Sequence, residues 1–251
     1  LNLDITDFDC SDVGTNSVTI TAVDVNGNSS STTADITVMD TISPTMASQN
    51  LTIYLDASGA ASITAAQVDS GSTDNCDIDS LYLDITDFDC SDTGVNVVTL
   101  TAVDGSSNSS STTADITVMD TIAPTMASQN LTIYLDASGA ASITAAQVDS
   151  GSTDNCNIDS LYLDQTDFDC SETGVNVVTL AVVDPSGNSS TITADITVLD
   201  TISPTMVSQN VTIYLDASGA ASITAANVDN GSTDNCSFDL SLSQSDFTCE
   251  D

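Results

Sequence analysis

Carboxylates are the main chemistry-bearing groups of this sequence. Asp and Glu total 37, Lys, Arg and His are absent, and the formal net charge is -37. No cationic side chain can neutralise a carboxylate here, so clustered carboxylates require an added cation. Calcium prefers six to eight oxygens from carboxylates, amides and backbone carbonyls, and magnesium suits irregular sites less well. The composition therefore predicts bound Ca²⁺ and excludes nucleic acid as a partner, because nothing in the sequence neutralises phosphate.

The candidate calcium ligands are acidic and amide residues at expected turns and repeat boundaries. Each boundary Asp precedes loops of the following repeat that carry more Asp and Asn, and the preceding repeat offers Asp12, Asp92 or Glu172. A single acidic turn residue is more often solvated than a ligand, so the prediction concerns at least one ion per repeat. The candidate ligands are Asp40, Asp69, Asp74, Asn75, Asp104, Asn108, Asp120, Asp149, Asp154, Asn155, Asp184, Asp200, Asp229 and Asp234.

The seven cysteines recur at two places and favour disulfides, because a sequence without His or CxxC is a poor zinc binder. One pairing lies within a repeat, and sequence proximity favours it: Cys76–Cys90, Cys156–Cys170 and Cys236–Cys249, with Cys10 pairing upstream. In the alternative, the two cysteines of a repeat lie at opposite ends of a sandwich. Cys90 then approaches Cys156 of the next repeat, and disulfides tie neighbours together.

An internal repeat of 80 residues organises the chain. Residues 41–120 and 121–200 differ at 11 of 80 positions. Residues 1–40 match the C-terminal half of this unit, and residues 201–251 match its N-terminal half and a little more. The expected domains are therefore a partial repeat, two complete repeats and a second partial repeat, as in a window cut from a longer array.

Each repeat has the pattern of short β-strands. Leu51, Ile53 and Leu55 alternate with polar or amphipathic residues, and residues 78–83, 87–90, 97–103 and 114–118 continue the period-two pattern. Asn26-Gly27 predicts a type I′ hairpin turn. Six or seven strands in 80 residues predict an all-β protein of tandem immunoglobulin-like sandwiches. A domain of this size is marginally stable and needs additional cross-links such as disulfides or bound metal ions.

The combination of motifs resembles the hyalin-type repeat and related immunoglobulin-like repeats of bacterial surface adhesins. The motifs are Gly-Ser-Thr-Asp-Asn-Cys76, Asp-Phe-Asp-Cys90, Val-Thr-Leu-x-Ala-Val-Asp104 and the closing Val-x-Asp-Thr-Ile-x-Pro. The resemblance implies extracellular or cell-surface modules for adhesion or gliding. Such repeats ordinarily contain Lys and Arg, and their absence here favours a metal-loaded fibre. Asp-Thr-Ile also resembles that group's O-glycosylation acceptor, which makes Thr41, Thr121 and Thr201 candidate sugar sites.

The sequence favours a structural role over catalysis. Asp87 and Asp89 are the one carboxylate pair weighed for glycosidase chemistry, yet they recur in each repeat without a pocket-forming insertion. The predicted function is a structural component of an extracellular fibre built from calcium-bridged, disulfide-stapled repeats. Its partners are neighbouring repeats or other copies of the chain, and no segment is apolar enough for membrane insertion. The alternative is the stalk of an adhesin that presents a separate ligand-binding tip.

Overall fold

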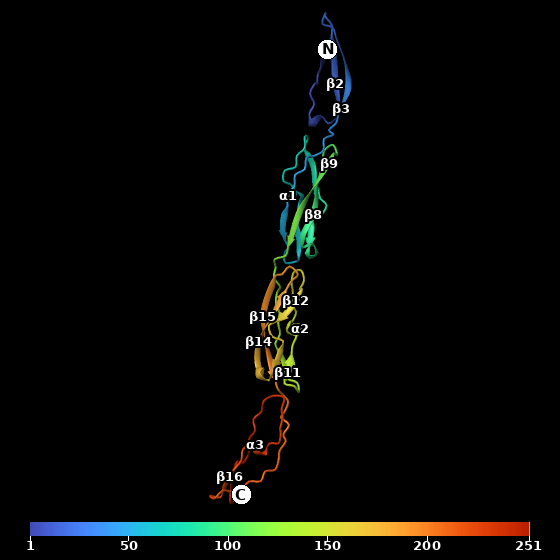
Figure 1. Ribbon diagram of the computed structural model, residues 1–251. Helices are drawn as coiled ribbons and strands as arrows, with labels where there is room; N and C mark the ends of the chain where they lie inside the picture. Colours follow the sequence, from blue (N-terminus) through green and yellow to red (C-terminus); the bar gives the residue numbers. More distant parts are fainter. Residues whose placement is uncertain (251) are drawn as a thin grey trace. The chain divides into compact units, whose positions relative to one another are not determined.

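The computed structural model describes residues 1–250, and the chain divides into two compact units, Leu1–Ile122 and Ala123–Asp251. Each unit consists mainly of β-strands, with the short helix α1 in the first unit and the short helices α2 and α3 in the second (Figure 1).

Residues 41–120 of the first unit form a sandwich of two sheets. One sheet has the order β4 (Leu51–Tyr54), β9 (Ser109–Met119), β8 (Gly94–Asp104), β6 (Ile78–Leu83), and the other pairs β5 (Ala60–Ser62) with β7 (Asp87–Asp89). Strand β4 runs parallel to β9, whereas the remaining pairs are antiparallel. The six strands confirm the immunoglobulin-like sandwich predicted from the sequence.

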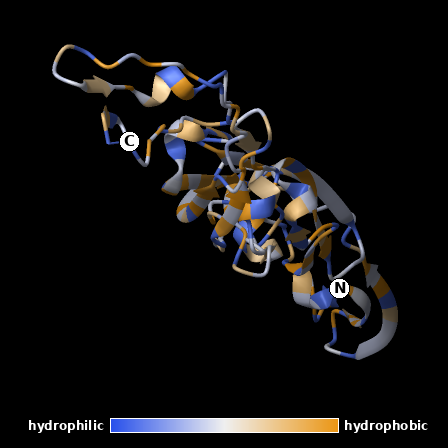
Figure 2. Cartoon of the chain, turned by 90° about the horizontal axis from the view of Figure 1, so that it is seen from below, coloured by the Kyte–Doolittle hydropathy of each residue, from blue (hydrophilic) through white to orange (hydrophobic). Residues whose placement is uncertain are grey.

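The core follows from strand alternation. Val98, Leu100 and Ala102 of β8 are fully buried, and the residues between them face outward. Hydrophobic and hydrophilic residues intermix along the ribbon (Figure 2). Phe88 of β7 and Val68 at the end of α1 (Ala65–Val68) close the core from the other side. The Gln67 side chain accepts the Thr64 N–H at 2.8 Å, which caps the first turn of α1.

Residues 1–40 form a three-stranded sheet of β1 (Asn2–Leu3), β2 (Gly14–Val23) and β3 (Ser29–Val38), preceded at β2 by the 3₁₀ turn η1 (Cys10–Asp12). The predicted type I′ turn is wrong. Gly27 has φ +88°, but Asn26 is not among the described non-glycine residues with positive φ. The Asp24 carboxylate instead accepts N–H bonds from Asn26 and Asn28, which stabilises a longer loop.

The second unit repeats this architecture. Its sandwich contains a sheet of β10 (Leu131–Tyr134), β15 (Ser189–Leu199), β14 (Gly174–Val183) and β12 (Ser160–Leu163), the pair β11 (Ala140–Ser142) and β13 (Asp167–Asp169), helix α2 (Ala145–Val148) and the 3₁₀ turn η3 (Cys170–Glu172). Further along lie β16 (Ala220–Ser222), α3 (Ala225–Val228) and β17 (Asp246–Thr248). The ten buried residues of its core cluster each lie 80 positions after a buried residue of the first unit.

Candidate metal centre

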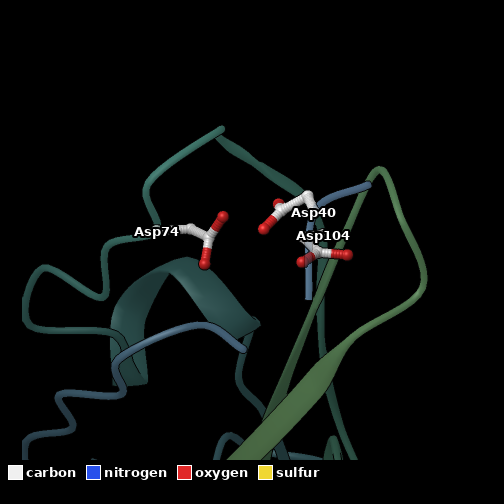
Figure 3. Close-up of side chains that lie close together, drawn as sticks. All are labelled: Asp40, Asp74 and Asp104. Atoms are coloured by element: carbon white, nitrogen blue, oxygen red, sulfur yellow. The ribbon is translucent and has the colours of Figure 1, made fainter. Parts of the chain in front are cut away.

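Three carboxylates of the first unit converge at one end of the sandwich. Asp40 follows β3, Asp74 lies in the loop after α1, and Asp104 is the last residue of β8. Their oxygen atoms lie within 4.8 Å of one another, and Figure 3 shows the three side chains gathered at the strand end. Asp104 is 2% exposed, and the other two are partly buried. Each carboxylate comes from a different segment, so only the folded chain brings the three together.

Hydrogen bonds hold two of these carboxylates in place. Asn108 donates its backbone N–H and its Nδ2 to the Asp104 carboxylate, both at 2.8 Å. Burial raises the pKa of Asp104, but these donors and the Ser106 N–H outweigh burial, so its pKa lies below the ordinary value. Asn75 Nδ2 donates to Asp40 Oδ1 at 3.1 Å, and Asn108 Nδ2 also donates to the Asp40 carbonyl at 3.2 Å. Amide N–H groups of Asn75 and Asn108 therefore stabilise these carboxylates, a role that Lys or Arg side chains ordinarily have.

Two buried carboxylate oxygens of the cluster have no hydrogen-bond donor among the described residues, namely Asp40 Oδ2 and Asp74 Oδ1. The other oxygen of Asp74 accepts the Cys76 N–H at 3.0 Å, which orients the side chain. Two ligands of one Ca²⁺ lie at most about 5 Å apart, because each Ca–O bond measures roughly 2.3–2.6 Å. The cluster is therefore compatible with a single Ca²⁺, and buried anionic oxygens without donors are costly unless a cation is bound.

A disulfide borders this cluster. Cys10 and Cys76 are joined with a Cα–Cα distance of 5.2 Å, and in the second unit Cys170 and Cys236 are joined at 5.5 Å. Each bridge spans a sequence separation of 66 residues. A loop of this length corresponds to about 4 kcal/mol of stabilisation in the chain-entropy model. The bridges connect residues 1–40 with residues 41–120, and residues 121–200 with residues 201–251.

The within-repeat pairing favoured by sequence proximity is wrong for Cys76–Cys90, Cys156–Cys170 and Cys236–Cys249, since Cys76 and Cys236 pair with Cys10 and Cys170. Cys249, which was also expected to be bridged, is the free cysteine of the described residues. Cys76 and Cys90 do not pair because strand β8, whose 11 residues cover about 35 Å, separates them. Cys90 lies just before its start, whereas Cys76 precedes Ile78, which pairs with its last residue, Asp104. Cys90 and Cys156 each take part in a disulfide and are not free thiols.

Several predicted ligands are used as turn caps. Asp69 accepts the N–H groups of Gly71 and Ser72 and is not in the three-residue cluster. The second unit repeats the arrangement: Asp149 accepts from Gly151 and Ser152, and Asp229 from Gly231 and Ser232. The carboxylates expected to reach the junction from the preceding repeat have the same kind of partner, since Asp12, Asp92 and Glu172 each accept the backbone N–H three residues earlier.

The second unit contains the periodic counterparts of Asp74 and Asp104. Asp154 Oδ2 accepts the Cys156 N–H at 3.0 Å, and its Oδ1 is buried without a donor among the described residues. Asp184 is 2% exposed and accepts from Asn188 Nδ2. The Asp120 side chain, in the first unit, accepts the Ile122 N–H.

The last predicted boundary, near residue 200, resembles the first. Asn235 Nδ2 donates to Asp200 Oδ1 at 3.1 Å, and Asp234 Oδ1 and Asn235 Oδ1 are buried without donors among the described residues. Asn75 and Asn155 occupy the positions that correspond to Asn235. For Asn75 and Asn235, the described bonds are donor bonds from the amide nitrogen. Asn75, which the sequence suggested as a ligand through its oxygen, therefore contacts the cluster through its nitrogen.

Two further features bear on function. Asp89 caps the turn η2 (Cys90–Asp92) by accepting from Ser91, and Asp87 accepts from Thr86, so the pair weighed as a glycosidase site serves local structure. Thr41, Thr121 and Thr201 are all exposed.

One residue that sequence reasoning missed is Gly139. A Cβ placed there would lie 2.6 Å from the Asn235 carbonyl oxygen and 2.8 Å from Cys170 Sγ, and the residue has φ +76°. Asn235 Nδ2 also donates to the Asp136 carbonyl of the same turn at 3.3 Å. The recurrent Asp-Ala-Ser-Gly sequence was the available signal for this contact, but it reads equally well as an ordinary turn.

No protein-family model and no curated protein sequence matches this chain. Similar solved structures include protocadherin gamma B7 extracellular cadherin domains 1–4 (13% identity, TM-score 0.35, covering 91% of this chain and 68% of that one). The protocadherin gammaB7 EC3-6 cis-dimer structure has 19% identity and a TM-score of 0.33, covering 85% and 64%. Titin domains I67–I69, in an E-to-A mutated variant, have 10% identity and a TM-score of 0.38, covering 74% and 75%.

The chain spans about two thirds to three quarters of the length of these structures. Within the described residues, no helix has both the length and the apolarity needed to cross a bilayer. The sheet order of the chain itself, with the first strand parallel to the last, identifies its fold as tandem immunoglobulin-like β-sandwiches.

Proposed function

We propose that this chain is part of an extracellular structural fibre whose repeats are joined by calcium and by disulfides. The disulfides support an oxidising, extracellular location, because such bonds are rare in reducing compartments. The motifs quoted above support a relationship to hyalin-type repeats of surface proteins.

The observation that carries the calcium proposal is the donor-free pair of oxygens, Asp40 Oδ2 and Asp74 Oδ1, in a chain without cationic side chains. Asp104 supplies the third carboxylate, and calcium would add the positive charge that the sequence lacks. When bound, the ion would fix the end of residues 1–40 to two loops of residues 41–120. By the 80-residue period, Asp154 and Asp184 of the second unit correspond to Asp74 and Asp104.

The cation and the disulfide act on the same loop. Asp74 is two residues from Cys76, which is bonded to Cys10 of the preceding segment. Calcium would order this loop from the ligand side while the disulfide holds it covalently. The connection between residues 1–40 and residues 41–120, called the joint below, would then have two independent attachments. Such a joint resists bending more than a single flexible linker does, which suits a load-bearing extracellular filament.

Thermal melting with and without chelation, combined with elemental analysis of the purified chain, tests the proposal. We expect calcium to raise the melting temperature and EDTA to lower it, because calcium binds the folded joint and not the unfolded chain. Magnesium at equal concentration is the control and should act more weakly. Identical melting in calcium and EDTA, with no bound metal, contradicts the proposal.

The exposed Thr41, Thr121 and Thr201 are proposed as glycosylation positions, on the strength of the Asp-Thr-Ile tripeptide. Intact-mass measurement of the chain purified from its natural source tests this assignment. Sugar masses located on these threonines support it, and unmodified peptides covering all three contradict it.

A further inference from the structure

Cys249, the free cysteine of the described residues, has the same local surroundings as the disulfide-bonded Cys170. Cys249 follows β17, which pairs with β16, and Cys170 follows β13, which pairs with β11 in the same register. The Cys249 Sγ lies 3.8 Å from the Gly219 carbonyl oxygen, and the Cys170 Sγ lies 3.7 Å from that of Gly139. Both sulfurs therefore lie beside the same glycine of the repeat.

The turn that contains this glycine is also the same in both places. Gly139 and Gly219 have φ values of +76° and +79°, and each donates its N–H to the carbonyl of the aspartate three residues earlier, at 2.9 and 3.0 Å. The carboxylates of these aspartates, Asp136 and Asp216, accept the backbone N–H groups two and four residues later at 2.8–3.1 Å. Because these bonds lie within the turn itself, the turn keeps its shape without help from another repeat.

At Cys170 these groups hold an Asn-Cys segment. Cys170 is bonded to Cys236, and the Cys170 Sγ lies 3.4 Å from the Asn235 carbonyl oxygen. The Nδ2 of Asn235 donates to the Asp136 carbonyl at 3.3 Å. A Cβ on Gly139 would lie 2.6 Å from the same Asn235 oxygen, so only glycine admits the segment at this distance. The turn and the cysteine together therefore recognise both residues of the segment.

The sulfur contact recurs in the first unit. Cys10 is bonded to Cys76, and the Cys10 Sγ lies 3.4 Å from the carbonyl oxygen of Asn75, which precedes Cys76. Cys76 and Cys236 both end the sequence Gly-Ser-Thr-Asp-Asn-Cys. In both units, a cysteine that follows a short Asp-Phe-Asp strand thus binds this loop of the following repeat.

We propose that Cys249 and the turn of residues 216–219 form a binding site for the Gly-Ser-Thr-Asp-Asn-Cys loop of a further repeat, which a disulfide then holds. The asparagine carbonyl of the loop would lie against Gly219, and its amide would donate to the Asp216 carbonyl. This inference rests on the proposed joining of repeats by disulfides and names the segment that Cys249 selects.

The bond forms by thiol–disulfide exchange. The Cys249 thiolate attacks the sulfur of a loop cysteine that is already in a mixed disulfide. A new sulfur–sulfur bond forms, the old one breaks, and the leaving thiolate takes up the proton that Cys249 lost. The exchange conserves electrons, so it needs no further oxidant.

Selectivity should come from the asparagine. Any thiol can form the sulfur–sulfur bond, whereas donation to the Asp216 carbonyl requires an amide side chain directly before the cysteine. A net contribution of one hydrogen bond corresponds to a preference of about three- to tenfold. We therefore expect an Asn-Cys loop to be favoured by this factor over an Ala-Cys loop.

Disulfide exchange between the full chain and capped synthetic peptides tests the proposal. The peptides Gly-Ser-Thr-Asp-Asn-Cys and Gly-Ser-Thr-Asp-Ala-Cys are supplied as mixed disulfides with glutathione, and mass spectrometry measures the equilibrium between peptide and glutathione adducts of Cys249. The Asn peptide should be favoured about three- to tenfold. A Cys249→Ser chain measures background exchange at the native bridges. Equal capture of the two peptides by the wild-type chain overturns the proposal.

A substitution in the turn locates the preference. Gly219→Ala places a methyl group where the asparagine carbonyl would lie and should abolish the preference for the Asn peptide. Because two peptides are compared on one chain, general hindrance of the thiol cancels. Gly231→Ala is the matched control, since Gly231 has a φ of +89° and its Cβ would meet no described atom within 4 Å. Preference that survives Gly219→Ala, or that is lost equally in Gly231→Ala, overturns the assigned contact.

Two features keep the result independent of folding and of calcium. If Gly219→Ala fails to fold, the comparison of the two peptides on the wild-type chain still decides. The exchange is measured in EDTA, whereas the joint is tested by melting in calcium and EDTA. Loss of the calcium effect with selective capture intact contradicts the metal proposal alone, and unselective capture with the calcium effect intact contradicts this inference alone.

Discussion

Replacing Asp74 by Asn should stabilise the chain in the absence of calcium and reduce the additional stability that calcium provides. Asparagine keeps the shape of the side chain and an oxygen that can accept the Cys76 N–H, but it removes one charge from the cluster. Two charges 4.8 Å apart repel by about 3.5 kcal/mol at an effective dielectric constant of 20, so Asp74 contributes about 7 kcal/mol against its two neighbours. Hydrogen bonds from Asn75 to Asp40 and from Asn108 to Asp104 offset part of this repulsion.

In EDTA we therefore expect Asp74→Asn to stabilise the joint by about 1–4 kcal/mol, raising its melting temperature by several degrees. In saturating calcium the loss of a charged ligand should weaken binding about 10- to 100-fold, which removes about 1.4–2.7 kcal/mol of ligand-linked stability. Differential scanning calorimetry in both buffers, with Asp79→Asn as an exposed control, measures the two effects. If the variant and the wild type melt alike in both buffers, the cluster neither repels nor binds calcium.

Three further perturbations test the joint and its surroundings. The double variant Cys10→Ser/Cys76→Ser removes the disulfide beside the Asp74 loop and should lower the affinity of Asp40, Asp74 and Asp104 for calcium about tenfold. Cys249→Ser, which removes a free thiol, is the control. Equal calcium affinities of the double variant and the wild type, measured by calorimetry, would refute this coupling. Gly139→Val should slow oxidation of Cys170–Cys236 and destabilise the second unit by about 2 kcal/mol or more, measured by thiol labelling and melting. Gly219→Val has a similar φ of +79° but would contact only Cys249 Sγ, so a loss as large as that of Gly139→Val would contradict the role of Asn235. Finally, hydrogen bonds from Ser58 and Ser138 lower the pKa values of Asp56 and Asp136. The stability that these ionised carboxylates contribute is complete above about pH 4 and is lost as pH falls through the lowered pKa values. Asp136→Asn should make the free energy of unfolding less dependent on pH in that window, and an unchanged pH profile would refute this prediction.

Strand positions and the core could be predicted because a period-two pattern is local. Leu51, Ile53 and Leu55 identify β4 from side-chain alternation alone, and the same holds for the buried residues of β8 and β9. The convergence of Asp40, Asp74 and Asp104 was predictable in outline, because each stands at a turn or strand end near the same boundary. Which acids join the cluster was not predictable. Asp69 occupies an equally suitable turn, but two local N–H groups use its carboxylate.

The cysteine pairing could not be chosen from the sequence because it depends on topology. Cys76 and Cys90 are close along the chain, yet the chain between them passes through β6 and β7 and places them at opposite ends of β8. The role of Asn75 could not be predicted for another reason. An amide offers both an acceptor and donors, and only the structure shows that Asn75 directs its nitrogen to Asp40.

Placing the disulfides between repeats has an energetic consequence that follows from loop length. A bridge from Cys76 to Cys90 would close a short loop and restrict the unfolded chain by about 3 kcal/mol, whereas the 66-residue separation of Cys10 and Cys76 gives about 4 kcal/mol. The longer bridge also retains the connection when calcium leaves, because it does not depend on ion concentration. Loss of calcium should then loosen the Asp74 loop and increase bending without separating the repeats. Calcium would thus control the stiffness of each joint, and the disulfide its integrity.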